Sequence, residues 1–214
     1  MSFKKESYEI VKNAITKDLA GFCHSYITNK RTVARHLKDS TFLSPYDQTW
    51  GVWADEQVPG TDTYAHYADL VMETLLVRLK GTMEKITGLR LVPSYSYVRI
   101  YRYGDKLLRH RDRKSCEISG TMHLGGDPWD LYIEPTGKLG KKGIKADLGP
   151  GDILIYRGCD LEHWREMFEG TDCAQVFFHY RILKGNQKHP QAFDGRPMLG
   201  LPNFFAPAPA EKEK

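Results

Sequence analysis

The chain has 214 residues, of which 41% are apolar and 27% charged, enough for the core of one domain and a poor fit for two. Its 31 basic and 27 acidic side chains are interspersed, so the net charge of +4 comes without a basic run typical of a nucleic-acid-binding tract. The N-terminal stretch is charged and amphipathic, and no apolar run is long enough to span a bilayer. The four cysteines stand singly, which favours reduced thiols. We therefore expect a soluble, cytoplasmic protein.

Two helices are expected before residue 89. Apolar residues recur at helical spacing from Tyr8 to Phe22, which predicts an amphipathic helix near the start. The segment 39–62 is rich in aromatic residues, Gly and Pro, and predicts a loop with one short strand at most. A second helical series runs from about Asp62 to Thr87, and Gly88 follows where a C-terminal cap belongs.

Short β-branched and aromatic runs, separated by Gly, Pro and Asp, dominate from residue 89 to 183. Helices followed by a block of strands predict an α+β fold, in which the helices buttress one sheet of a sandwich or barrel. The last residues, "APAPAEKEK", have the composition of a disordered end. We predict a single domain over residues 1–203, with helices within 5–88 and a strand core over 89–183, followed by a disordered tail at 204–214.

A metal site is suggested by His110 and Asp112, whose side chains share one face of an extended chain. A lone pair of this kind is weak evidence, because a surface salt bridge explains it equally well. His163 strengthens the hypothesis, since it follows a turn, an apolar strand and a short loop in "LGPGDILIYRGCDLEH". Two imidazoles and one carboxylate, with no thiolate, suit a non-haem Fe(II) site with open positions better than a closed structural zinc site.

The region from about Leu91 to Ile182 resembles the Fe(II)- and 2-oxoglutarate-dependent oxygenases, in particular their prolyl-4-hydroxylase-like branch. The likeness rests on Tyr101 nine residues before His110, on "HRD", on "GGDPWDLYIEP" and on "LGPGDILIY". The resemblance implies a double-stranded β-helix, with Fe(II) held by the two histidines and Asp112, and with 2-oxoglutarate contacted by Tyr101. It also implies that O2 converts 2-oxoglutarate to succinate and CO2 while a substrate C–H bond is hydroxylated.

The sequence departs from this branch at the base that pairs with the distal carboxylate of 2-oxoglutarate. The branch carries Lys or Arg nine or ten residues after the distal histidine, where this chain has Asp172 and Cys173. An anion cannot neutralise an anion, so another base is needed. We expect Arg165, which shares the strand face of His163 and can bind a carboxylate bidentately. Two bases on the last predicted strand remain as alternatives: His179 and Arg181.

These features predict a dioxygenase acting on a prolyl, peptidyl or amino-acid substrate, by analogy with the branch. Two alternatives stay open: a non-catalytic cupin-like binding module, which would lack Fe(II) affinity, and a Zn-dependent hydrolase or isomerase with the same triad, which would act without O2. A nucleic-acid partner is not expected, because "DCAQVFFHYR" lacks the arginine pair of the nucleic-acid demethylases. Compact members also occur in tailed phages, which would place such a protein in the host cytoplasm. The sequence leaves the oligomeric state and the hydroxylated position open.

Overall fold

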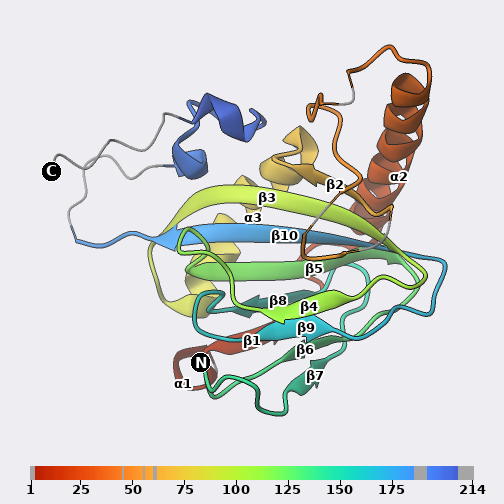
Figure 1. The fold of residues 1–214 in the computed structure, drawn as a ribbon. Helices are drawn as coiled ribbons and strands as arrows, with labels where there is room; N and C mark the ends of the chain where they lie inside the picture. The colour runs from red at the N-terminus through yellow and green to blue at the C-terminus, as the bar shows by residue number, and fades with distance from the viewer. Residues whose placement is uncertain (1–2, 45, 55, 60–61, 186–191, 207–214) are drawn as a thin grey trace, which may run out of the picture.

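Two facing antiparallel sheets dominate the computed structural model, which describes residues 3–44, 46–54, 56–59, 62–185 and 192–206 (Figure 1). The larger sheet has the strand order β1 (Tyr8–Val11), β8 (Ile153–Tyr156), β5 (Ile118–Gly126), β10 (Asp172–Ile182), β3 (Leu91–Arg102) and β2 (Tyr64–Tyr67). The smaller sheet has the order β4 (Leu107–His110), β9 (His163–Arg165), β6 (Leu131–Ile133) and β7 (Ile144–Ala146). The arrangement is a double-stranded β-helix, which confirms the predicted α+β class.

Two long helices, α2 (Lys17–Asp39) and α3 (Leu70–Thr87), pack against the large sheet, on β5 and β3 respectively (Figure 1). The end of α3 confirms the predicted cap, because Gly88 adopts a left-handed φ of 70° and its N–H donates to the carbonyl of Glu84. The helix begins later than predicted. Residues 64–67 are drawn into β2 by pairing with β3, and the carboxylate of Asp69 then caps the first turn of α3.

The helix predicted from Tyr8 to Phe22 is wrong in its first half. Tyr8–Val11 forms β1 and pairs with β8, and the chain then turns at Asn13, which has a φ of 51°. Helix α2 starts only at Lys17, where the hydroxyl of Thr16 accepts the N–H of Leu19. The apolar spacing therefore ran across a strand, a turn and a helix.

The apolar core has one main layer between the helices and the large sheet, which includes Ile27, Leu76, Met83, Val98 and Phe178. A smaller apolar cluster lies around Leu131, Ile133 and Leu154 and includes strands of both sheets. The four cysteines form no disulfide. The remaining short elements are α1 (Phe3–Glu6) and the 3-10 helices η1 (Ala192–Gly195) and η2 (Asn203–Phe205).

Residues 192–206 return to the large sheet after β10 and lie beside β3 (Figure 1). Arg196 anchors them through a buried ion pair with Glu73 of α3. Of the predicted tail, residues 207–214 lie outside the described part of the chain, and Asn203–Phe205 forms η2. Within the described residues, no helix combines the length and apolarity needed to traverse a membrane.

Candidate active site

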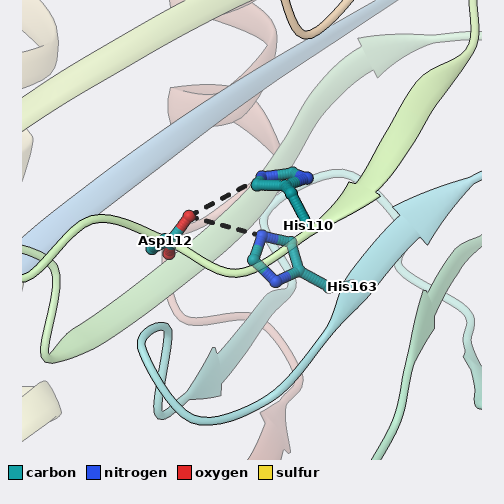
Figure 2. A group of neighbouring side chains, drawn as sticks. All are labelled: His110, Asp112 and His163. Atoms are coloured by element: carbon teal, nitrogen blue, oxygen red, sulfur yellow. Dashed lines mark ion pairs between the residues drawn. The ribbon is translucent and has the colours of Figure 1, made fainter. Parts of the chain in front are cut away.

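His110, Asp112 and His163 converge at one end of the small sheet (Figure 2). His110 and His163 face each other across the β4–β9 pair, with ring centroids 4.3 Å apart. Oδ1 of Asp112 lies 3.7 Å from Nε2 of His110 and 3.4 Å from Nε2 of His163. One ligand atom from each side chain fits within 4.8 Å of the others. The predicted triad is thus brought together, although Asp112 lies in the loop after β4 and not on the strand.

Backbone carbonyls orient both imidazoles. Nδ1 of His110 lies 2.7 Å from the carbonyl oxygen of Leu108, and Nδ1 of His163 lies 3.1 Å from that of Leu161. A carbonyl only accepts, so each Nδ1 carries a proton, and in the neutral form of each ring Nε2 keeps the lone pair. Both lone pairs face Asp112, which is the orientation that metal-ligating histidines require.

The charges of the three side chains also suit a cation. Burial lowers the pKa of His110 to about 4, and the nearby His163 acts in the same direction, so the ring is neutral at pH 7. Burial alone would raise the pKa of Asp112, but its interactions with His163 and His179 and a hydrogen bond from Ser119 hold it well below its usual range. Nitrogen and oxygen donors of this kind fit a divalent metal such as Fe(II).

Arg165 lies on the same face of β9 as His163, inside the barrel. Trp164 points the other way, stacks on Tyr132 with ring centroids 5.6 Å apart, and carries the guanidinium of Arg109 at 3.5 Å. Arg165 is fully buried, and its Nη1 donates to the carbonyl of Trp129. Its Nε and Nη2 atoms are buried without a hydrogen-bond partner among the described residues. Because two donors of a buried cation are left over, the site has capacity for an anion.

Tyr101 lies beside Arg165. The Tyr101 ring is 4.8 Å from that of Trp129, and the Arg165 guanidinium lies 5.0 Å from the same Trp129 ring. Cys173 is the cross-strand partner of Tyr101. A small, buried thiol therefore stands beside Tyr101 at a position where the resemblance led us to expect a base. Burial lowers the pKa of Arg165, yet a guanidinium remains charged at neutral pH because its ordinary pKa is so high.

The acidic Asp172 and the two alternative bases, His179 and Arg181, lie elsewhere. Asp172 turns away from the barrel, with Oδ1 3.6 Å from Nε2 of His24. His179 is at the metal end, where its Nδ1 lies 3.9 Å from Oδ2 of Asp112. Arg181 pairs in register with Val92, near the far end of β10 from Cys173. Of the three candidate bases, Arg165 is therefore the one that the fold places next to Tyr101.

A cavity of about 650 Å³ opens onto the triad. Its walls combine tyrosine rings with side chains of both charges, including Tyr67, Tyr95, Tyr97, Arg111, Arg113 and Asp194. Tyr67 and Tyr95 stack with centroids 5.0 Å apart, and Arg113 lies 4.4 Å from the Tyr95 ring.

Two lining residues come from the segment 192–206, which lies beyond the strand core predicted over residues 89–183. Asp194 accepts hydrogen bonds from Arg113 and from the hydroxyl of Tyr67, and Asn203 also faces the cavity. Arg196 holds this segment in place by donating to the carbonyls of Phe193 and Leu201 at 2.6 Å each, besides pairing with Glu73. No sequence signal identifies Asp194 as a lining residue, because its position depends on a contact with a helix more than a hundred residues earlier.

No family model and no curated protein matches the sequence. Solved structures do match. A prolyl-4-hydroxylase from Pseudomonas putida is 12% identical with a TM-score of 0.56, over 84% of this chain and 95% of that one. HygX from Streptomyces hygroscopicus, solved with nickel, 2-oxoglutarate and hygromycin B bound, is 12% identical with a TM-score of 0.59, over 84% of each chain. A viral collagen prolyl hydroxylase from Paramecium Bursaria Chlorella virus-1, solved as a 2OG complex, is 9% identical with a TM-score of 0.55, over 84% and 98%.

The chain therefore has the fold of the 2-oxoglutarate- and Fe(II)-dependent oxygenases, and the resemblance indicated by the sequence is confirmed at the level of the fold.

Proposed function

We propose that this protein is a Fe(II)- and 2-oxoglutarate-dependent dioxygenase that hydroxylates a C–H bond of a prolyl, peptidyl or amino-acid substrate. The observation that carries the proposal is the pairing of two features inside one barrel. A two-histidine, one-carboxylate set includes His163 of β9, and a buried guanidinium, with two nitrogens unpartnered among the described residues, lies two residues further along that strand. The first suits a metal with open positions, and the second suits a carboxylate.

The spacing of these features matches the co-substrate. Two residues of extended strand advance by about 7 Å. That is comparable to the distance between the 2-oxo end of 2-oxoglutarate, which would face the metal, and its distal carboxylate, which would reach Arg165. Tyr101 would contact the same carboxylate from β3. When bound, Fe(II) and 2-oxoglutarate would supply electrons that activate O2, the oxidant, so that O2, 2-oxoglutarate and a substrate C–H bond yield succinate, CO2 and an alcohol.

The residues of this chain bind and orient the metal and 2-oxoglutarate, and they exclude water from both. The imidazoles present fixed lone pairs, because their Nδ1 protons are held by backbone carbonyls. Arg165 neutralises the distal carboxylate away from water, since its side chain is fully buried. The aromatic walls around Tyr95 and Trp129 limit water near the metal and strengthen each charge interaction inside.

The cavity supports a substrate of modest size. A volume of about 650 Å³ is that of a site for a small molecule or a short peptide segment. The side chains of Tyr67, Tyr95 and Tyr97 offer aromatic surface against which a proline ring can pack. Polar atoms of a peptide or amino acid could bind three further lining residues: Glu56, Arg111 and Asn203. HygX, by contrast, has an aminoglycoside bound, so a small-molecule substrate is the alternative within the same activity.

The test is succinate release by metal-stripped protein resupplied with Fe(II), 2-oxoglutarate and air, screened over amino acids, proline-containing peptides and common metabolites. We expect succinate above the uncoupled background with one class, and none without O2. Absence of Fe(II) binding would favour the cupin-like binding module. Substrate turnover under argon with Zn2+ would favour the hydrolase or isomerase.

A further inference from the structure

The two carboxylate oxygens of Asp112 face different partners. Oδ1 faces the two imidazole Nε2 atoms, whereas Oδ2 accepts a hydrogen bond of 2.6 Å from the hydroxyl of Ser119 on β5. Ser119 is fully buried. Building on the proposed function, we propose that Ser119, together with Gly158, is a positioning residue that makes Asp112 ligate the metal through Oδ1 alone.

Gly158 contributes by having no side chain. A Cβ at this position would overlap Oδ2 of Asp112, Oγ of Ser119 and the carbonyl oxygen of Cys116. The carbonyl of Gly158 also accepts the N–H of Asp112 at 2.9 Å, which fixes the backbone of the ligand. The glycine therefore allows the close approach on which the Ser119–Asp112 hydrogen bond depends, and it ties the loop after β4 to the loop before β9.

The direction of the hydrogen bonds follows from the number of protons. Ser119 has one hydroxyl proton, and an ionised Asp112 can only accept, so this proton points to Oδ2. Nδ1 of His179 lies 3.0 Å from the same hydroxyl oxygen and must then be the donor to it. A chain of donors thus runs from His179 on β10, through Ser119 on β5, to Asp112. Each member restricts the rotation of the next, so the carboxylate cannot turn without breaking the hydrogen bond from Ser119.

Restriction to one oxygen matters for the number of open positions. A metal with six positions and three single-atom protein ligands keeps three for small ligands, which is what a chelating 2-oxo acid and O2 together occupy. A second oxygen from Asp112 would remove one of them. Second contacts of this kind commonly change metal affinity by about 10–100-fold.

Mn(II) serves as the probe, because its binding and its bound waters are measured without turnover. Ser119→Ala removes the hydroxyl, and Ser96→Ala is the matched control, since Ser96 is another buried serine of the large sheet whose Oγ has no partner among the described residues. The Kd follows from the electron paramagnetic resonance signal of free Mn(II). The number of waters on the ion follows from the water-proton relaxivity per bound Mn(II).

In Ser119→Ala we expect the Kd to rise about 10-fold or more and the relaxivity per bound ion to fall by about a third, as one of three waters is displaced. Ser96→Ala should match the wild type in both. Gly158→Ala should reproduce the rise in Kd by displacing Oδ2, with the fold checked by circular dichroism. An unchanged Kd or an unchanged relaxivity in Ser119→Ala overturns this inference and leaves the proposed function standing. If the wild type takes up no Mn(II), the metal centre of the proposed function fails with it.

Discussion

The two sheets of the barrel contrast in length and in what they carry. The strands β3, β5 and β10 of the large sheet have 12, 9 and 11 residues, and α2 and α3 cover the sheet from outside. The strands β4, β9, β6 and β7 have 4, 3, 3 and 3 residues. Nevertheless, the small sheet supplies His110, His163 and Arg165, whereas the large sheet supplies their supports, such as Ser119. A long, covered sheet thus provides the rigid frame, and short strands present the reactive groups against it.

The contrast predicts that the metal ligands can be lost without loss of the fold. Replacing His110, Asp112 or His163 by Ala should abolish Fe(II)-dependent succinate formation, because each removes one of only three protein ligands. The melting temperature should change little, since the two histidines lie at the ends of short strands, Asp112 lies in the loop after β4, and none is in the main apolar layer. Activity assays alongside thermal unfolding check this. Wild-type turnover in two of the three variants would rule out the metal site.

The opposite outcome is expected at Glu73 of α3, the helix that packs on β3 of the large sheet. Glu73→Gln leaves the Arg196 charge buried without its partner, because both side chains have 0% exposure, and should reduce the free energy of unfolding by about 3–5 kcal/mol. Urea unfolding measures the loss. Glu84→Gln on the same helix is the control, since its ion pair with Lys80 is partly exposed and should contribute less than about 1 kcal/mol. A Glu73→Gln protein as stable as this control would contradict the anchor.

Arg165→Ala tests the second group that the small sheet presents, the guanidinium proposed to bind 2-oxoglutarate. We expect the apparent KM for 2-oxoglutarate to rise by on the order of 10²-fold, from the loss of about 2–3 kcal/mol of charge-assisted pairing, with little change in Fe(II) affinity. Arg165→Lys should recover part of the loss, because a point charge replaces a planar fork. Adding Cys173→Lys to Arg165→Ala should also lower the KM, since Cys173 borders the same space from β10. An unchanged KM in Arg165→Ala would pass the role to His179 or Arg181.

The smallest effect is expected at the C-terminus. Deleting residues 204–214 removes Phe204 and Phe205, which are 67% and 49% exposed, together with a tail of Pro, Ala, Lys and Glu. Such a change should alter stability by less than about 0.5 kcal/mol, because Phe204 and Phe205 are largely exposed and the composition of the tail is that of a disordered end. A clear drop in the melting temperature would show that the tail packs on the domain.

The sequence predicted what depends on local pattern. Strand texture predicted the block from β3 to β10, Gly88 predicted the end of α3, and strand alternation placed Arg165 on the side of His163 and Trp164 on the other. The error at Tyr8–Val11 has a physical cause. A four-residue edge strand followed by a turn at Asn13 happens to continue the apolar spacing of α2, and only its partner β8 shows that it is a strand.

Ser119, Gly158 and Asp194 escaped prediction because each acts through a partner distant in the chain. Ser119 reads as an ordinary strand residue until β5 is placed behind the loop of Asp112. Gly158 reads as a turn residue, although its φ is not left-handed and the structure requires glycine there for close approach. Local propensity does not encode such contacts, since they arise only when the sheets close.

The anchor between Glu73 and Arg196 also sets an order of assembly. Glu73 is part of α3 and is synthesised early. The guanidinium that compensates its buried charge belongs to Arg196, which follows β10 and is synthesised 123 residues later. Until Arg196 is synthesised, the Glu73 carboxylate is more stable when hydrated than when buried without a partner. Full packing of α3 on β3 around it is therefore unfavourable at that stage. Docking of the helix is thereby coupled to the arrival of the segment that brings Asp194 to the cavity. A ribosome-bound chain would therefore complete the cavity wall that includes Asp194 and the packing of α3 on the sheet in the same late step. This step would come after every strand of the barrel has been made.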